Sequence, residues 1–310
     1  MKHKNKIIIW SSILVLIIAT VVLLLIFRHK PVLTAVDNSP YLDASGHLIV
    51  TTSLFPVYDF AKIVGGDRAT VSLILPAGSE AHAYKPSDID KETIKKSAIF
   101  FYTSSIMEPW APALSSTVTS KTKILAVAEN LNDETLDPHV WLDFTKASLM
   151  VDNIASEYKL VDPKNATYYQ QNADNYKQEL SKLDSDFEVG LKNCKLHEFI
   201  SGGHYAFGYL AKRYNLKYQA AQGFIPDDSL DVQKVLRLSK ELKDSGQPYV
   251  YYEESIMPYL AELMHQESGS KKMPLNAAHN IGKFDIESGV TFISLMRSDL
   301  ETLKIGLSCK

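Results

Sequence analysis

Cysteine is scarce in this chain, which has 2 cysteines among its 310 residues. Two thiols are too few for a disulfide-dense scaffold, and they exclude a zinc site built on four cysteines. Gly and Pro, with 14 and 13 residues, are too rare for a collagen-like or low-complexity chain. A basic excess is also missing: Lys plus Arg is 33, Asp plus Glu is 36, and the formal net charge is −3. This balance argues against a nucleic-acid-binding protein.

The sequence motifs of common hydrolases are missing as well. Neither HExxH nor GxSxG occurs in the chain. A catalytic zinc needs an open coordination position and usually a general base, and Glu254 is the one candidate for that base. The sequence therefore predicts that this protein is not an enzyme.

One long apolar run stands near the N-terminus, at residues 7–27. Its 21 residues contain no charge and match the roughly 20 apolar residues that span a bilayer. Because the preceding tail is short and the remainder is long and polar, we expect the tail inside and the folded part outside the cell membrane. We expect residues 1–30 to form an uncleaved, single-pass anchor. A cleaved signal peptide is the alternative, although its apolar region is usually only about 7–15 residues long.

Strand and helix patterns alternate in the rest of the chain, after a polar, turn-rich tether at residues 31–46. The expected strands are 48–53, 70–75, 98–102, 123–127, 198–201, 217–220 and 248–252. The expected helices are 56–64, 87–96, 145–158, 165–189, 231–244, 258–267 and 290–305. Alternation of this kind is typical of an α/β fold with parallel strands.

The segment 165–189 predicts an unusually long helix. Its apolar residues recur at intervals of three and four, at Tyr169, Ala173, Tyr176, Leu180, Leu183 and Phe187. Such spacing places one apolar stripe on a helix about 37 Å long. A helix of this length could join two lobes, and a plain surface helix fits the periodicity almost as well. We expect an α/β lobe at 47–144, a helical block at 145–193 and a second α/β lobe at 194–310.

Three histidines have unusual positions: His82 lies in the loop after the expected strand 70–75, His204 directly follows the expected strand 198–201, and His139 lies in the segment DPHVWLD. Ligands of open α/β sheets bind beyond the carboxyl ends of the strands. Neutral imidazole is a good ligand for zinc and its neighbours in the transition series, so three such residues could share one metal ion. The gaps between them are too long to form a local motif, and the spacing alone leaves the metal site unproven.

Four segments occur in a fixed order: LPAGSEAHAYKPSD, MEPWAPAL, DPHVWLD and HYAFGYLAKRYNL. Together they resemble the metal-specific solute-binding proteins of zinc and manganese ABC transporters, over roughly residues 48–308. The resemblance implies two α/β lobes joined by a long rigid helix, with the metal in the cleft between them. It also implies that His82, His139 and His204 are metal ligands and that an ABC permease is the partner. We expect a monomer.

The residue type at the third ligand position indicates which metal is bound. Relatives that look like manganese receptors tend to have Glu where this chain has His204, whereas zinc receptors have His. The resemblance therefore implies a Zn²⁺ receptor, with a Mn²⁺ or mixed-metal receptor, or a metal-stabilised adhesin, as the alternatives. The family's fourth ligand is an Asp, and Asn276 stands at the matching position. Glu254, His279, Glu80 or a water are the other candidates for the fourth ligand.

Acidic residues and cysteines near these motifs suggest further roles. Asp137 could orient the imidazole of His139, as carboxylates do around metal sites, and Asp143 is expected to cap the helix that follows. Cys194 and Cys309 could form a disulfide, since export permits one, and two free thiols are the alternative.

Overall fold

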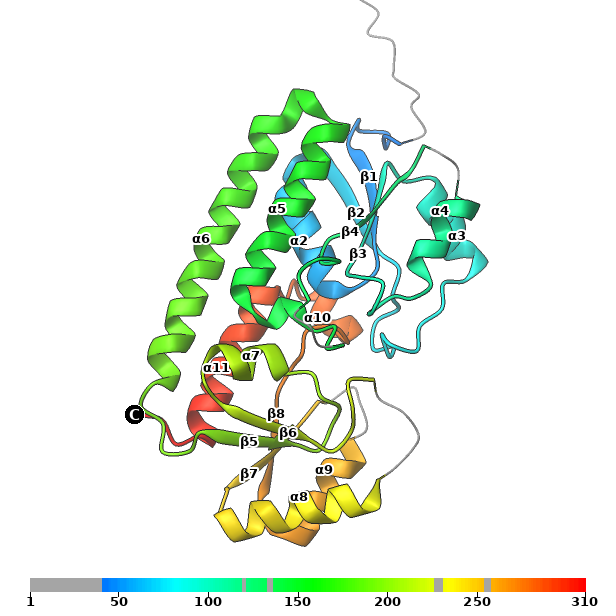
Figure 1. Cartoon of the computed structure of the whole chain (residues 1–310). Helices are drawn as coiled ribbons and strands as arrows, with labels where there is room; N and C mark the ends of the chain where they lie inside the picture. Colours follow the sequence, from blue (N-terminus) through cyan, green and yellow to red (C-terminus); the bar gives the residue numbers. More distant parts are fainter. Residues whose placement is uncertain (1–40, 119–120, 133–135, 226–230, 254–257) are drawn as a thin grey trace, which may run out of the picture. The chain divides into compact units, whose positions relative to one another are not determined.

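The structure is a computed structural model that describes residues 41–118, 121–132, 136–225, 231–253 and 258–310. It contains two four-stranded sheets of parallel strands (Figure 1), which confirms the expected α/β class. The expected membrane helix at residues 7–27 lies outside the described residues. Within the described ranges, no helix is both long and apolar enough to cross a membrane.

The first sheet has the strand order β2-β1-β3-β4. Its strands are β1 (Leu48–Thr52), β2 (Ala69–Leu73), β3 (Ile99–Tyr102) and β4 (Lys123–Ala126). Its helices are α2 (Phe55–Gly65), α3 (Asp88–Lys95) and α4 (Ala111–Thr117). Ser87 and Asp90 form a capping box that starts α3 at the expected place. The four strands were all predicted to within about two residues of their observed bounds.

A pair of long helices follows this sheet. These are α5 (Phe144–Val161) and α6 (Ala166–Leu191), and the 3-10 turns of this half are Gly66–Arg68, Val140–Leu142 and Pro163–Asn165. Asp143 caps α5 by accepting a hydrogen bond from the backbone N–H of Thr145, as expected. The six apolar residues of the predicted stripe on α6 are all buried, so the stripe is confirmed. With 26 residues, α6 is about 39 Å long, and it runs beside α5 along the first half of the molecule (Figure 1).

The second sheet has the strand order β6-β5-β7-β8. Its strands are β5 (Glu198–Ser201), β6 (Lys217–Ala220), β7 (Tyr249–Tyr252) and β8 (Lys271–Pro274). Its helices are α7 (Gly208–Arg213), α8 (Val232–Ser245), α9 (Pro258–Ser268), α10 (Lys283–Glu287) and α11 (Phe292–Gly306). Sequence patterns missed β8, because this edge strand has two lysines and a proline, residues that protect sheet edges and disguise a strand.

The C-terminal helix α11 packs against α6 and α2, so the chain returns to its first half (Figure 1). Asp59 on α2 fixes this packing: its Oδ2 accepts hydrogen bonds from the Tyr176 hydroxyl, at 3.1 Å, and from the Phe292 N–H, at 3.0 Å. A disulfide joins Cys194 to Cys309 and holds the end of α11 beside the start of the second lobe. The expected disulfide is thus present.

Candidate metal centre

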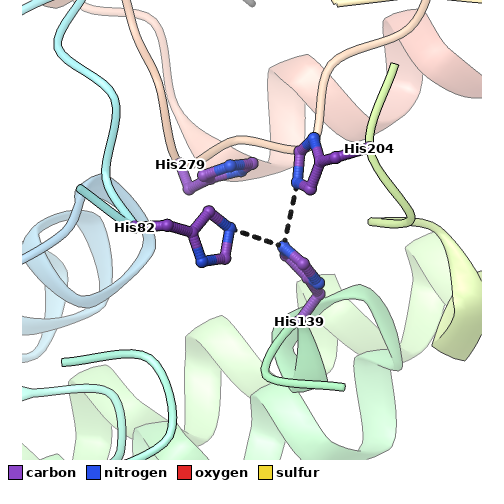
Figure 2. Close-up of side chains that lie close together, drawn as sticks. All are labelled: His82, His139, His204 and His279. Carbon is purple, nitrogen blue, oxygen red and sulfur yellow. Dashed lines mark hydrogen bonds between the residues drawn. The ribbon is translucent and has the colours of Figure 1, made fainter. Parts of the chain in front are cut away.

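Four histidines meet where the loops of the two sheets face each other. His82 lies between β2 and α3, and His139 lies between β4 and α5. His204 follows β5, and His279 lies between β8 and α10. Each loop begins at the carboxyl end of a parallel strand, which is where open α/β sheets place ligands. Figure 2 shows the four imidazole rings turned toward one common point.

The spacing of the ring nitrogens fits a tetrahedral ion. One nitrogen of each imidazole lies within 4.8 Å of the other three. The Nε2 of His139 is 3.3 Å from that of His82 and 3.2 Å from that of His204. For zinc–nitrogen bonds of about 2.0–2.1 Å, two ligands of a tetrahedron lie about 3.3 Å apart. The four side chains therefore fit one Zn²⁺ ion without rearrangement of these two pairs.

Burial makes three of these imidazoles unlike surface histidines. His139, His204 and His279 have no solvent exposure, whereas His82 is partly exposed. The Trp141 ring packs against His139, with 5.4 Å between the ring centroids, and its indole N–H donates to the backbone carbonyl of Ala277. Trp141 thus lies beside the centre and holds the loop that carries His279.

Asp137 orients His139. Its Oδ1 accepts hydrogen bonds from the His139 backbone N–H at 3.0 Å and from His139 Nδ1 at 2.7 Å. This fixes the ring proton on Nδ1 and leaves the Nε2 lone pair free for a metal. Burial, together with the neighbouring imidazoles, holds the pKa of His139 well below its ordinary value. His139 is therefore neutral and ready to bind at pH 7.

Glu253 has the matching position beside His204. Its Oε1 lies 2.8 Å from His204 Nδ1, although the ring N–H does not point straight at that oxygen. Burial is the largest single influence on His204 and lowers its pKa, but the charge and hydrogen bonding of Glu253, together with the charges of Glu80 and Asp137, outweigh burial and raise that pKa. His204 thus differs from the other three rings, because its proton is held more tightly and a metal must displace it.

His82 stands on the most open side of the centre. The Glu80 carboxylate accepts a hydrogen bond from the His82 backbone N–H at 2.8 Å, and the Ala81 N–H donates to the side-chain oxygen of Asn280 at 3.0 Å. The first contact lies within the loop of His82, and the second ties that loop to the loop of His279. Burial, with the nearby His204, lowers the pKa of His82 to about 3, so this ring is also neutral at pH 7.

A strained turn aims His279 at the centre. The side-chain oxygen of Asn276 accepts a hydrogen bond from the Ala278 N–H at 2.7 Å, which forms an Asx turn. Ala278 has a φ of 65°, a left-handed conformation that costs roughly 1–2 kcal/mol in a residue with a Cβ. Burial holds the pKa of His279 well below its ordinary value. The turn therefore presents a neutral, buried imidazole to the other three.

The structure brings some of the predicted site residues together and keeps others apart. His82, His139 and His204 come together, and His279 joins them. Asn276 and Glu80 do not: the oxygen of Asn276 and one carboxylate oxygen of Glu80 are engaged by loop N–H groups. Glu254 lies outside the described residues. Glu253 and Glu254 both follow the expected strand 248–252, where they fit either a role in the cleft or solvated charges at a strand end, and the resemblance favoured Glu254. The signal for Glu253 was its position one residue after β7.

This fold is shared with a known protein family. Residues 50–306 match the family described as zinc-uptake complex component A, periplasmic, also called ZnuA. The chain belongs to this family, and the resemblance seen in its motifs is confirmed.

Individual relatives are known as proteins that bind zinc. The zinc-binding protein AdcA of Streptococcus pyogenes is 30% identical over 291 residues, which cover 84% of this chain and 56% of AdcA. The high-affinity zinc uptake system protein ZnuA of Bacillus subtilis is 30% identical over 283 residues, 85% of this chain and 88% of ZnuA. This chain thus spans about half the length of the AdcA proteins that it matches.

Solved structures show the same architecture. The Zn(II)-bound ZnuA-like domain of Streptococcus pneumoniae AdcA has a TM-score of 0.75 and 33% identity, and covers 84% of this chain and 99% of that domain. The laminin-binding protein of Streptococcus agalactiae, described as having adhesin and metal-transporting activity, has a TM-score of 0.77 and 28% identity. That alignment covers 84% of this chain and 99% of the laminin-binding protein.

Proposed function

We propose that this protein is a solute-binding receptor that captures Zn²⁺ between its two lobes and delivers it to an ABC permease. The observation that carries the proposal is the convergence of four buried or half-buried imidazoles, with two Nε2 pairs 3.2 and 3.3 Å apart. His82, His139, His204 and His279 are the proposed ligands. Membership of the zinc-uptake family and the zinc-binding relatives support the choice of cargo.

The donor atoms favour zinc over manganese. Manganese prefers carboxylate and carbonyl oxygens, whereas imidazole suits zinc and its neighbours. His279 supplies a fourth nitrogen in place of the carboxylate that the family pattern implies, so all four donors are neutral nitrogens. A receptor for manganese or for mixed metals is the alternative that the titration below addresses.

The protonation states and positions of the four histidines suggest how zinc is captured and released. The low pKa values of His82, His139 and His279 leave their nitrogens unprotonated at pH 7, so an arriving ion competes mainly with the proton on His204. Because the ligand loops come from both sheets, the ion links the two halves. Delivery then requires these loops to separate, and His82 is the ligand that solvent or a permease reaches first.

The membrane side of the proposal rests on the sequence. We propose that residues 7–27 anchor the chain and that 31–46 tether the lobes at 47–144 and 194–310, with the block at 145–193 between them, outside the cell membrane. The Streptococcus pneumoniae relative is a zinc-binding lipoprotein. For this chain, whose first cysteine is Cys194, we propose that the apolar run is the anchor. A tether keeps the receptor at high effective concentration near its permease.

The test is a competition titration of the full chain in detergent against a chromophoric zinc chelator, with manganese in parallel. We expect one tightly bound zinc per chain, lost in His204→Ala and kept in the exposed control His197→Ala. Manganese binding as tight as zinc would move the assignment to a mixed-metal receptor. Absence of tight binding by either metal would contradict the receptor function and favour the adhesin reading.

A further inference from the structure

The loop at residues 275–282, called the His279 loop below, is held by both halves of the molecule. It leaves the second sheet at the end of β8, and at its start the Leu275 N–H donates a hydrogen bond to the carbonyl of Tyr252 at 2.9 Å. From Ala277 onward its hydrogen bonds include several to loops of the first sheet. These contacts decide which half of the molecule His279 follows when the two halves separate.

Hydrogen bonds on either side of His279 join its loop to the half built on the first sheet. Trp141, from the turn before α5, donates its indole N–H to the carbonyl of Ala277 at 2.8 Å. Gly78, from the loop after β2, donates its N–H to the carbonyl of Ile281 at 2.8 Å. Ala277 and Ile281 are both buried. His279 therefore lies between two attachments to the first half.

Asn280 supplies a third attachment, through its side chain. Its Oδ1 accepts a hydrogen bond from the Ala81 N–H at 3.0 Å, and the two residues are only 7% and 2% exposed. Asn280 directly follows His279 in the sequence, and Ala81 directly precedes His82. The contact thus joins two proposed ligands through their immediate neighbours. Because the Ala81 N–H is buried, loss of its acceptor would leave it without a partner, which costs more than loss of an exposed hydrogen bond.

His204 is held by the second half instead. The Tyr218 hydroxyl donates to the carbonyl of His204 at 3.0 Å, and the Gln222 N–H donates to the carbonyl of Gly203 at 3.0 Å. Tyr218 lies on β6 and Gln222 lies just beyond it, so both contacts fall within the second half. Two of the other proposed ligands come from loops of the first sheet, and the attachments above place His279 with them. The four histidines therefore divide three to one between the halves.

We propose that Asn280 is a positioning residue, which locks the His279 loop to the loop of His82 and keeps three proposed zinc ligands together when His204 moves away. Zinc is then held by three imidazoles until the last stage of its release. Without the Asn280 contact, His279 separates from His82 as the halves part, and the ion leaves a site with fewer ligands. The lock stands on the contacts of this chain, and its effect on zinc rests on the proposed receptor function.

The first experiment measures zinc release from the full chain in detergent, by rapid mixing of the zinc-loaded protein with excess chelator. Asn280→Ala should release zinc about tenfold faster than the wild type, which is the factor that one buried hydrogen bond corresponds to. Its association rate should stay within about twofold of the wild-type rate, because the lock acts after the ion has bound. A merely weakened fold would not confine the change to release.

Two variants frame this comparison. Asn280→Asp keeps an acceptor oxygen for the Ala81 N–H, and its added negative charge also favours a bound cation, so it should release zinc no faster than the wild type does. The matched control is Asn172→Ala. The Nδ2 of Asn172 donates to the carbonyl of Val64 at 3.1 Å and so links α6 to α2, which makes it a similar side-chain contact between elements that carry none of the four histidines. Its zinc release should match that of the wild type.

The second experiment needs no metal, since hydrogen exchange of the Ala81 amide in the metal-free full chain reports on the lock directly. Protection should be present in the wild type, lost in Asn280→Ala and kept in Asn280→Asp and Asn172→Ala. An unprotected Ala81 amide in the wild type would overturn the proposal without any variant. If Asn280→Ala fails to fold by circular dichroism, Asn280→Ser takes its place, because a serine hydroxyl ends one atom short of the amide oxygen.

The outcomes separate the lock from the receptor function. Tight zinc binding with equal release rates in Asn280→Ala and Asn172→Ala would contradict the lock alone. Absence of tight zinc binding in the wild type would contradict the receptor function and with it the effect on release, whereas the exchange of the Ala81 amide would still decide whether Asn280 joins the two loops.

Discussion

Removal of the His279 imidazole is the sharpest test of the four-nitrogen centre. Structural zinc sites with four ligands bind with about 10–16 kcal/mol, or roughly 2.5–4 kcal/mol per ligand. His279 has no solvent exposure, but the space left by alanine admits a water that recovers part of that energy. We therefore expect His279→Ala to lose about 2–3 kcal/mol of zinc affinity, which is about 30- to 160-fold.

The assay is chelator competition at pH 7.5, with His197→Ala as the control because that histidine is exposed and lies in another pocket. His279→Glu should recover most of the zinc affinity and, with a carboxylate in the centre, should bind manganese more tightly than the wild type does. If His279→Ala binds zinc as tightly as His197→Ala, His279 is not a ligand and the reasoning from nitrogen geometry is wrong.

Three further predictions concern the groups around the centre and the fold. Glu253→Gln should weaken zinc binding about 10- to 100-fold and lower the pKa of His204 in the metal-free protein, which chelator competition and imidazole NMR titration check; an unchanged pKa would contradict the proposed contact. Burial raises the pKa of Asp59 to about 6 from 3.8, so the stability from its protonation is complete below about pH 4 and is lost as the pH rises through 6. Relative to Asp59→Asn, the metal-free wild type should lose up to about 3 kcal/mol of unfolding free energy between pH 4 and 7 in urea titrations, and a constant difference would refute the shifted pKa. The disulfide closes a loop of 115 residues, and the double change Cys194→Ser and Cys309→Ser should cost about 4–5 kcal/mol on the chain-entropy account, measured by urea unfolding, while the zinc stoichiometry stays at one.

The alternation of strands and helices made most of the fold predictable. Buried parallel strands have continuous apolar runs, and the stripe on α6 has a clear helical period. Strand β8 is the exception, because a four-residue edge strand with sequence KKMP has neither signal. Its pairing with β7 is decided by the tertiary structure, which a local pattern does not contain.

The metal-site residues that belong to a recognisable sequence motif could be predicted, whereas the residue positioned by the conformation of a loop could not. His82, His139 and His204 stand within segments whose neighbours are also recognisable. The fourth position was not, because Asn276 aligned with the expected carboxylate while its oxygen is used to build the turn before His279. His279 faces the other three histidines because Ala278 adopts a left-handed conformation. This conformation is uncommon for residues other than glycine, so the sequence does not predict it.

The adjacent residues Glu253 and Glu254 also could not be distinguished from the sequence. Successive residues at the end of a strand point to opposite faces, so a shift of one residue decides which carboxylate reaches a ligand. No sequence pattern favoured Glu253 over Glu254, and the contact of Glu253 with His204 Nδ1 follows from where β7 ends.

In the proposed centre, the negative charges that favour metal binding lie on carboxylates behind the imidazoles, whereas the atoms that select the metal are the imidazole nitrogens. Four neutral imidazoles would leave Zn²⁺ with its full double charge, which a site with three fully buried ligands tolerates poorly. In the proposed zinc complex, Asp137 and Glu253 would supply two negative charges through the far nitrogens of His139 and His204, so the ion would be neutralised while all four proposed donor atoms are nitrogens. Hard ions such as Mn²⁺ would be attracted by the negative charge, but the proposed donor set offers them no oxygen ligand. Glu253→Gln should therefore weaken zinc and cobalt by similar factors, whereas His279→Glu should change their order relative to manganese. The two variants together distinguish outer charge from donor type.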